Sequence, residues 1–94
     1  MRIPESTKGH VWHQYTIRVK RNREEAVRKL RDAGIGTGIY YPNPAHTIPH
    51  VKKAVGQWSL PITERAASQV ISLPVHPALT DEDLDRIIAV TNTL

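Results

Sequence analysis

The first regular pattern in the chain is an alternation of residue types over residues 11–19. One face carries Val11, His13, Tyr15, Ile17 and Val19, and the other carries Trp12, Gln14, Thr16, Arg18 and Lys20. A period of two is that of a β-strand, whose successive side chains point to opposite faces. The alternation therefore predicts a strand with one buried face.

A helical pattern follows this strand. Apolar residues recur at helical spacing as Ala26, Val27, Leu30 and Ala33, which predicts a helix over about 23–33. Asn22 and Glu25 resemble a capping box with Asn in place of Ser or Thr, and Gly34 suits the left-handed position after the last turn. Residues 35–40 can then return as a short strand beside the first, which completes a β-α-β unit.

The middle of the chain contains two shorter helical patterns. Pro49 fits the first turn of a short helix through Ala54, which Gly56 would end. Thr63 is a candidate N-cap for a second helix, through Glu64, Ala67 and Val70. Residues 70–73 then form a short apolar run that predicts a strand, and Pro74 stops it.

The C-terminal residues predict a last helix. Thr80 can cap it, with Asp83 at the third helical position and further acids in the first turn. Its predicted apolar face consists of Leu84, Ile87, Ile88, Thr91 and Leu94. The order of elements predicts an α+β fold, a two-layer sandwich in which helices cover one face of a small, largely antiparallel sheet.

Composition limits the class of protein. Ninety-four residues form one domain, and the absence of cysteine excludes disulfides and thiolate metal sites, so we expect a cytoplasmic location. No apolar run approaches the roughly 18 residues of a membrane span, so no membrane association is expected.

The net charge of +4 raises nucleic acid as a possible partner. Seven of the thirteen basic residues lie within residues 18–31. Within this stretch Glu24 and Arg28, and likewise Glu25 and Lys29, have the i,i+4 spacing of ion pairs on a solvated helix. Because no aromatic residues are interleaved with the basic ones, we regard nucleic-acid binding as the weaker interpretation.

Residues 34–46 are the strongest candidate for a binding loop. Three glycines, two prolines, two tyrosines and a histidine combine backbone freedom with rigid turns and hydrogen-bonding side chains. A plain connection between helix and strand explains the glycines and prolines equally well. The glycines follow a helix instead of preceding one, which argues against a phosphate-binding loop.

No set of residues predicts a metal site or a catalytic centre. His46 and His50 have i,i+4 spacing, but Pro49 interrupts any helix holding both, and no acid lies near them in the sequence. No serine stands in a nucleophile elbow, and the acids are explained by capping and surface pairing. We therefore predict neither a metal ligand nor a catalytic residue.

Four motifs in series carry a family resemblance. They are HVWHQYTIR at 10–18, GIGTGIYYP at 34–42, LP at 60–61 and LPVHPALT at 73–80. Over roughly residues 9–94 the chain resembles the C-terminal small domain of the DegT/DnrJ/StrS sugar aminotransferases. These are PLP-dependent enzymes of the aspartate aminotransferase fold that transfer an amino group onto nucleotide-linked keto sugars. We accordingly divide the chain into an N-terminal tail, 1–9, and the small domain, 10–94.

The resemblance implies where a substrate would bind. Tyr41 and His46 would face the sugar or diphosphate of the substrate, where His46 could donate to a phosphate oxygen. Tyr40 is a third substrate-binding candidate. The family pattern is usually closer to His-Tyr-Pro-x-Pro-Leu-His, so Tyr40 replaces a common histidine and Ala45 a common leucine.

The resemblance also implies what this chain lacks. In the family a large N-terminal domain supplies the Schiff-base lysine and the carboxylate that pairs with the PLP ring. We therefore expect no cofactor bound by this chain alone, no transamination by it alone, a possible large-domain partner chain, and self-association through the face left exposed. The alternative is a standalone binding module that holds a protein or nucleic acid through the basic 18–31 stretch.

Overall fold

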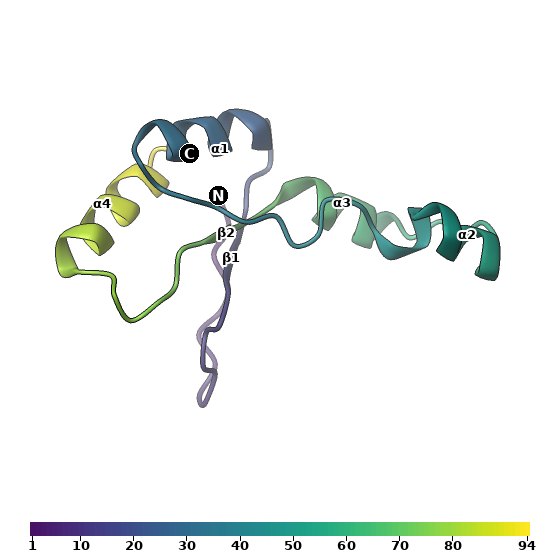
Figure 1. Ribbon diagram of the computed structural model, residues 1–94, viewed down its shortest axis with the longest axis horizontal. Coiled ribbons are helices and arrows are strands. Elements are labelled where there is room, and N and C mark those ends of the chain that lie inside the picture. The colour runs from purple at the N-terminus through teal and green to yellow at the C-terminus, as the bar shows by residue number, and fades with distance from the viewer.

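The fold is built from four α-helices, one short 3-10 helix and one antiparallel strand pair (Figure 1). A computed structural model describes all residues from 1 to 94. The elements in order are β1 (Tyr15–Arg18), α1 (Arg23–Asp32), η1 (Ala45–Thr47), α2 (Pro49–Val55), α3 (Pro61–Gln69), β2 (Val70–Leu73) and α4 (Asp81–Thr91). The predicted α+β class with an antiparallel sheet is confirmed.

The sheet pairs two strands that lie far apart in the sequence. β1 and β2 are antiparallel, with Ile17 opposite Ile71 on the buried face. On the other face the hydroxyls of Thr16 and Ser72 lie 2.8 Å apart. Single bridges flank the pair, because Arg2 exchanges two backbone hydrogen bonds with Arg18, and Gly38 exchanges two with Ser72.

The first strand is shorter than the alternation predicted. Residues 11–14 lie outside it, Val11 is exposed, and Trp12 has a left-handed backbone with φ of 49°. In the register of the sheet Tyr15 faces Leu73, so Gln14 would have to pair with Pro74. Proline has no backbone N–H to donate, which ends the ladder at Tyr15.

The predicted β-α-β unit is wrong. Residues 35–40 form no strand beside β1; their single bridge, at Gly38, is to Ser72 of β2. The far edge of β1 is instead occupied by Arg2. The returning segment therefore joins the opposite edge of the sheet.

Helices α1 and α4 share one core with the buried face of the strands. The core consists of Ile17, Val19, Ala26, Leu30, Ile35, Ile71 and Ile87. The predicted ends of α1 are confirmed, because the Asn22 side chain accepts a bond from the backbone N–H of Glu25 and Gly34 has φ of 78°. Glu24, Glu25, Arg28 and Lys29 are all exposed, as the predicted solvated face requires, but neither i,i+4 pair comes within ion-pair distance; the one acid–base side-chain contact that short is between His46 and Glu64.

Helix α4 has the predicted cap but only part of the predicted face. Thr80 and Asp83 form a reciprocal capping box, with hydrogen bonds of 3.0 and 3.1 Å. Ile87 and Thr91 are buried and Leu94 packs on the core, whereas Leu84 and Ile88 are exposed. Two of the five residues of the apolar stripe are left uncovered because α4 packs against α1 on one side.

Helices α2 and α3 are close to their predicted positions. Helix α2 begins at Pro49 and ends at Gly56, whose φ of 83° is left-handed, as its predicted role requires. The predicted cap of α3 is wrong, because the helix begins at Pro61 and places Thr63 in its first turn. The Glu64 carboxylate accepts the backbone N–H of Leu60 and so performs the capping function.

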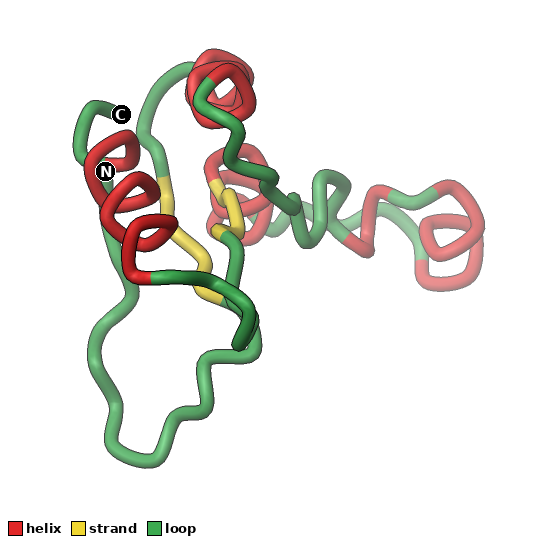
Figure 2. Tube along the Cα trace, turned by 60° about the vertical axis from the view of Figure 1, so that its left-hand side comes forward, coloured by secondary structure: helices red, strands yellow, loops and turns green.

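Residues 41–62 project from the body as an arm (Figures 1 and 2). The chain measures 48 by 32 by 21 Å, and its radius of gyration is 15.4 Å. A compact domain of this length would have a radius of about 12 Å. The arm exposes Tyr41, Val55, Trp58, Leu60 and Ile62, and we call residues 41–62 with these side chains the apolar arm.

None of the helices has both the length and the apolar character that a membrane span requires.

Candidate functional site

The candidate loop leaves the sheet at Gly38. The Tyr40 ring lies over this glycine, so a Cβ at position 38 would come within 2.5 Å of Tyr40 Cε2. The bridge to Ser72 holds the backbone of Gly38 in place. The third glycine of the segment therefore permits a close approach between the loop and its own tyrosine.

The two tyrosines stand at the root of the apolar arm. Tyr40 is 50% exposed and Tyr41 is 75% exposed. Their rings meet edge to face, with centroids 5.9 Å apart. Such a pair presents a large apolar surface with hydrogen-bonding tips, as a sugar or base requires.

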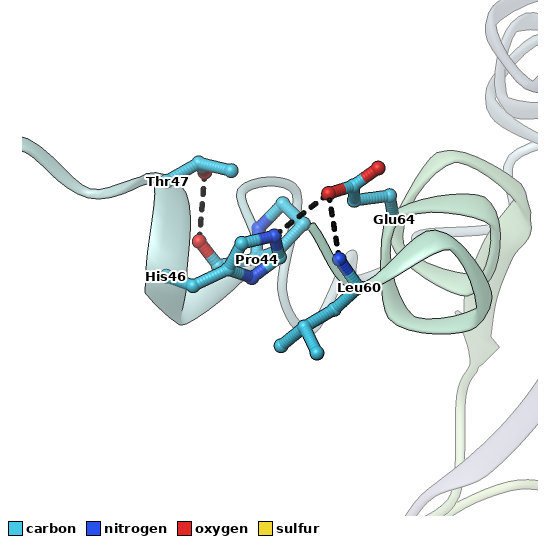
Figure 3. A network of polar contacts seen from close by, with 5 residues as sticks. All are labelled: Pro44, His46, Thr47, Leu60 and Glu64. Atoms are coloured by element: carbon cyan, nitrogen blue, oxygen red, sulfur yellow. Dashed lines mark hydrogen bonds and ion pairs between the residues drawn. The ribbon is translucent and has the colours of Figure 1, made fainter. Parts of the chain in front are cut away.

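His46 is placed differently from the tyrosines. It lies in η1 and is only 9% exposed. Its Nε2 is 2.8 Å from Glu64 Oε1, and the same oxygen accepts the backbone N–H of Leu60 at 3.2 Å (Figure 3). The Thr47 hydroxyl donates to the Pro44 carbonyl at 2.7 Å, which closes the turn that carries the histidine.

The electrostatics of this pair favour the ionised carboxylate. The hydrogen bond from His46, and next the bond from the Leu60 backbone, lower the pKa of Glu64 below its ordinary value. Glu64 was predicted only as a residue within a helix. The structure makes it the partner of His46, 18 positions away in the chain.

Two cavities lie beside the loop. A hollow of about 260 Å³ separates Tyr40, Tyr41 and the following turn from α3 and Val70. A larger cleft of about 720 Å³ lies between residues 34–38, the turn after β2 and the start of α4. Tyr40 lines both cavities, Tyr41 lines only the hollow, and His46 lines neither.

The larger cleft contains polar residues that the sequence did not single out as a site. His13, His76, Asp83 and Arg86 all line it. Arg86 and His76 lie close enough to the Asp83 carboxylate to contribute to its lowered pKa, although the bonds with Thr80 are the main cause. These residues come from separate parts of the chain, so no local spacing could have indicated the cluster.

The basic stretch is partly used within the fold. Arg18 donates to the Gln69 side chain at 2.7 Å, and Arg23 donates to the Ala67 carbonyl. Both contacts tie the strand and α1 to the end of α3. The exposed basic residues of the stretch are Lys20, Arg21, Arg28, Lys29 and Arg31.

Comparison with solved structures finds a likeness to aminotransferases over nearly all of this chain. A DegT DnrJ EryC1 StrS aminotransferase from Brucella abortus matches with a TM-score of 0.83 and 36% identity, covering 98% of this chain and 25% of that one. NtdA from Bacillus subtilis, solved with bound cofactor PMP, matches with a TM-score of 0.84 and 35% identity, covering 98% of this chain and 22% of that one.

Sequence comparison gives the family. The DegT/DnrJ/EryC1/StrS aminotransferase family model matches residues 1–92, and the chain belongs to this family. The dTDP-3-amino-3,6-dideoxy-alpha-D-galactopyranose transaminase of Aneurinibacillus thermoaerophilus is 40% identical over 88 residues, which are 90% of this chain and 23% of that protein. The dTDP-3-amino-3,4,6-trideoxy-alpha-D-glucose transaminase of Micromonospora megalomicea subsp. nigra is 40% identical over 94 residues, covering 94% and 24%. The chain spans about a quarter of the length of such relatives.

The residues present do not form a PLP site. A Schiff-base lysine needs a sheltered pocket and a carboxylate partner for the cofactor ring. The lysines of this chain, Lys8, Lys20, Lys29, Lys52 and Lys53, are all exposed, and none lines the cleft or the hollow. No group of three or more His, Asp or Glu side chains could hold a metal ion.

Proposed function

We propose that this chain is the small domain of a sugar-nucleotide aminotransferase and supplies substrate contacts from the loop of Tyr40, Tyr41 and His46. The PLP chemistry belongs to a lysine-bearing large domain, and the chain alone does not transaminate. Family membership over residues 1–92 and the likeness to a structure holding PMP support this assignment. In this proposal residues 1–9 remain a tail and residues 10–94 the domain, in a cytoplasmic enzyme.

One observation carries the proposal. The loop displays the ring of Tyr41 to solvent while the neighbouring His46 is fixed by Glu64. A binding loop needs a contact surface together with a support that limits the entropy lost on binding. A loop that only connects two elements needs neither an exposed aromatic ring nor a histidine held by a carboxylate.

The relatives suggest the substrate class. Two of them are named as transaminases of dTDP-linked aminodeoxy sugars. We therefore propose a nucleotide-linked keto sugar as the substrate of the complete enzyme.

We assign the apolar arm, apart from the substrate-contacting Tyr41 at its root, to contact with the large domain. The arm's exposed aromatic and aliphatic side chains are too many for a region that stays in water. In the absence of a large domain, the same surface would drive self-association of the chain.

A ligand titration tests the substrate contact. We expect dTDP-glucose to shift the NMR signals of Tyr41 and His46 selectively in the 94-residue chain. Tyr41→Ala should weaken this binding about tenfold, equivalent to about 1.4 kcal/mol. Val11→Ala, a change at another exposed apolar position, is the matched control and should bind as the parent chain does. If no nucleotide sugar binds, even with a co-expressed large domain, the proposal is wrong.

The competing function is a standalone module that binds nucleic acid through residues 18–31. The five exposed basic residues of that stretch are the observation in its favour. Binding of a duplex oligonucleotide that weakens steeply with added salt would support the module, because counterion release makes phosphate binding salt dependent. We expect no such binding at physiological salt.

A further inference from the structure

The contact between His46 and Glu64 fixes which ring nitrogen is free. A neutral imidazole has one nitrogen that donates and one that accepts. An ionised carboxylate can only accept, so Nε2, which lies 2.8 Å from Glu64 Oε1, must carry the proton. In the neutral ring Nδ1 is then an acceptor.

The other ring nitrogen of His46, Nδ1, has no hydrogen-bond partner within the chain, in contrast to Nε2. The Thr91 hydroxyl is the one buried side-chain polar atom without a partner. Nδ1 is therefore not completely buried, although the residue as a whole is only 9% exposed.

Glu64 is itself held in position. It stands in the first turn of α3, and its Oε1 also accepts the Leu60 backbone N–H at 3.2 Å. Figure 3 shows this Glu64 oxygen between the His46 ring, in η1, and the Leu60 backbone at the start of α3. The carboxylate is thus a fixed point against which the ring is oriented.

We propose that Glu64 is a positioning residue that holds His46 by Nε2, so that Nδ1 accepts a hydrogen bond from a hydroxyl of the ligand. This inference rests on the proposed function and narrows it, since the histidine would recognise the sugar of a nucleotide sugar and not its diphosphate. An acceptor nitrogen placed against a phosphate oxygen would bring two lone pairs together, which opposes binding. The family resemblance implied contact with the sugar or the diphosphate and a donation from His46 to a phosphate oxygen, and the present proposal departs from that donation.

The first test needs no ligand. Long-range proton–nitrogen NMR at neutral pH distinguishes a ring protonated at Nε2, at Nδ1 or at both nitrogens. We expect His46 to carry its proton on Nε2 and to show a slowly exchanging Nε2–H signal. In Glu64→Ala that signal should be lost to rapid exchange with water, and in Glu64→Gln it should weaken.

Controls separate this effect from a general change of fold. Glu24→Gln, in the first turn of α1, removes one negative charge elsewhere and should leave His46 unchanged. His10 is an internal reference, because its Nδ1 accepts the Trp12 backbone N–H at 2.9 Å independently of Glu64. A proton on Nδ1 of His46, or on both nitrogens, in the parent chain would overturn the proposal.

The second test compares ligands. We expect dTDP-glucose to shift the Nδ1 resonance of His46, and dTDP or inorganic pyrophosphate to leave it unchanged. A shift of Nδ1 with pyrophosphate would overturn the choice of sugar over phosphate. If dTDP-glucose leaves the signals of both Tyr41 and His46 unchanged, the substrate contact of the proposed function is contradicted. The positioning of the His46 ring by Glu64 is tested separately, by the first experiment.

Discussion

Thr91 lies in the turn of α4 that faces the core, and it is only 6% exposed. Its hydroxyl makes no hydrogen bond. A buried polar group without a partner has lost its hydration and gained nothing in exchange. Most buried hydroxyls in folded proteins are satisfied, so this position is a local weakness of the core.

Thr91→Val should therefore raise stability. The valine has nearly the same shape and removes the unsatisfied hydroxyl, so we expect the free energy of unfolding to rise by about 1 kcal/mol. Urea unfolding followed by circular dichroism measures the change. The matched control is Thr93→Val, which removes a hydroxyl that donates to the Val90 carbonyl at 2.7 Å and should not stabilise the chain. An equal gain from both changes would contradict this reasoning.

Glu64 makes a pH-dependent contribution to stability. Its pKa in the folded chain lies below the reference value of 4.5, chiefly because of the bond from His46. A carboxylate with a lowered folded pKa stabilises the fold above the unfolded pKa, and the contribution is lost as the pH falls through the folded pKa. We expect the stability difference between the parent chain and Glu64→Gln to be present at neutral pH and to shrink below about pH 4.5. A difference that stays constant or grows on acidification would contradict the assignment.

The sequence predicted the residues of the loop but not their support. Tyr40, Tyr41 and His46 stand in a short motif that can be recognised locally. Glu64 is 18 residues beyond His46 and looks like any acid near a helix start. Its role depends on how η1 packs against α3, which no local spacing encodes.

Two threonines near helix starts, Thr80 and Thr63, differ in whether they cap their helix. Thr80→Ala removes a reciprocal capping box and should lower the free energy of unfolding by about 1 kcal/mol. Thr63, the predicted cap of α3, lies inside that helix, where its hydroxyl makes no capping bond. Thr63→Ala should therefore change stability by less than about 0.5 kcal/mol. Thermal or urea unfolding of both variants provides the comparison, and a larger loss from Thr63→Ala would restore the original prediction.

Local signals predicted the elements well where they were strong. Helices α1 and α4 have caps and periodic apolar residues, and both were found at the predicted residues. The wrong predictions concern segments whose structure depends on the strand that they pair with. Residues 11–14 alternate like a strand, but the register would place Gln14 opposite Pro74, and residues 35–40 could have paired with either edge of the sheet.

At the scale of the whole molecule, the apolar arm decides how the chain behaves in solution. Trp58 is 61% exposed and Ile62 is 82% exposed. We expect concentration-dependent self-association in sedimentation experiments, with a blue shift of tryptophan fluorescence as Trp58 becomes buried. Ile62→Asp should abolish association and leave the monomer's stability unchanged, because the side chain makes no core contact.

Val11→Asp is the control for this prediction. It places the same charge at an exposed apolar position outside the arm and should leave association unchanged. A chain that remains monomeric at high concentration, or equal effects of the two substitutions, would contradict the role assigned to the arm.

The arm lies within a longer segment whose two ends are held together, since Gly38 and Ser72 are hydrogen bonded to each other. The entropy of closing such a loop rises slowly with its length, by about 0.6 kcal/mol for each doubling. Residues could thus be inserted or deleted around Gly56, where the chain is exposed, at little cost to the strand register. Insertions and deletions at this tip could reshape the edge of the binding site over evolutionary time, while the body that carries it folds as before.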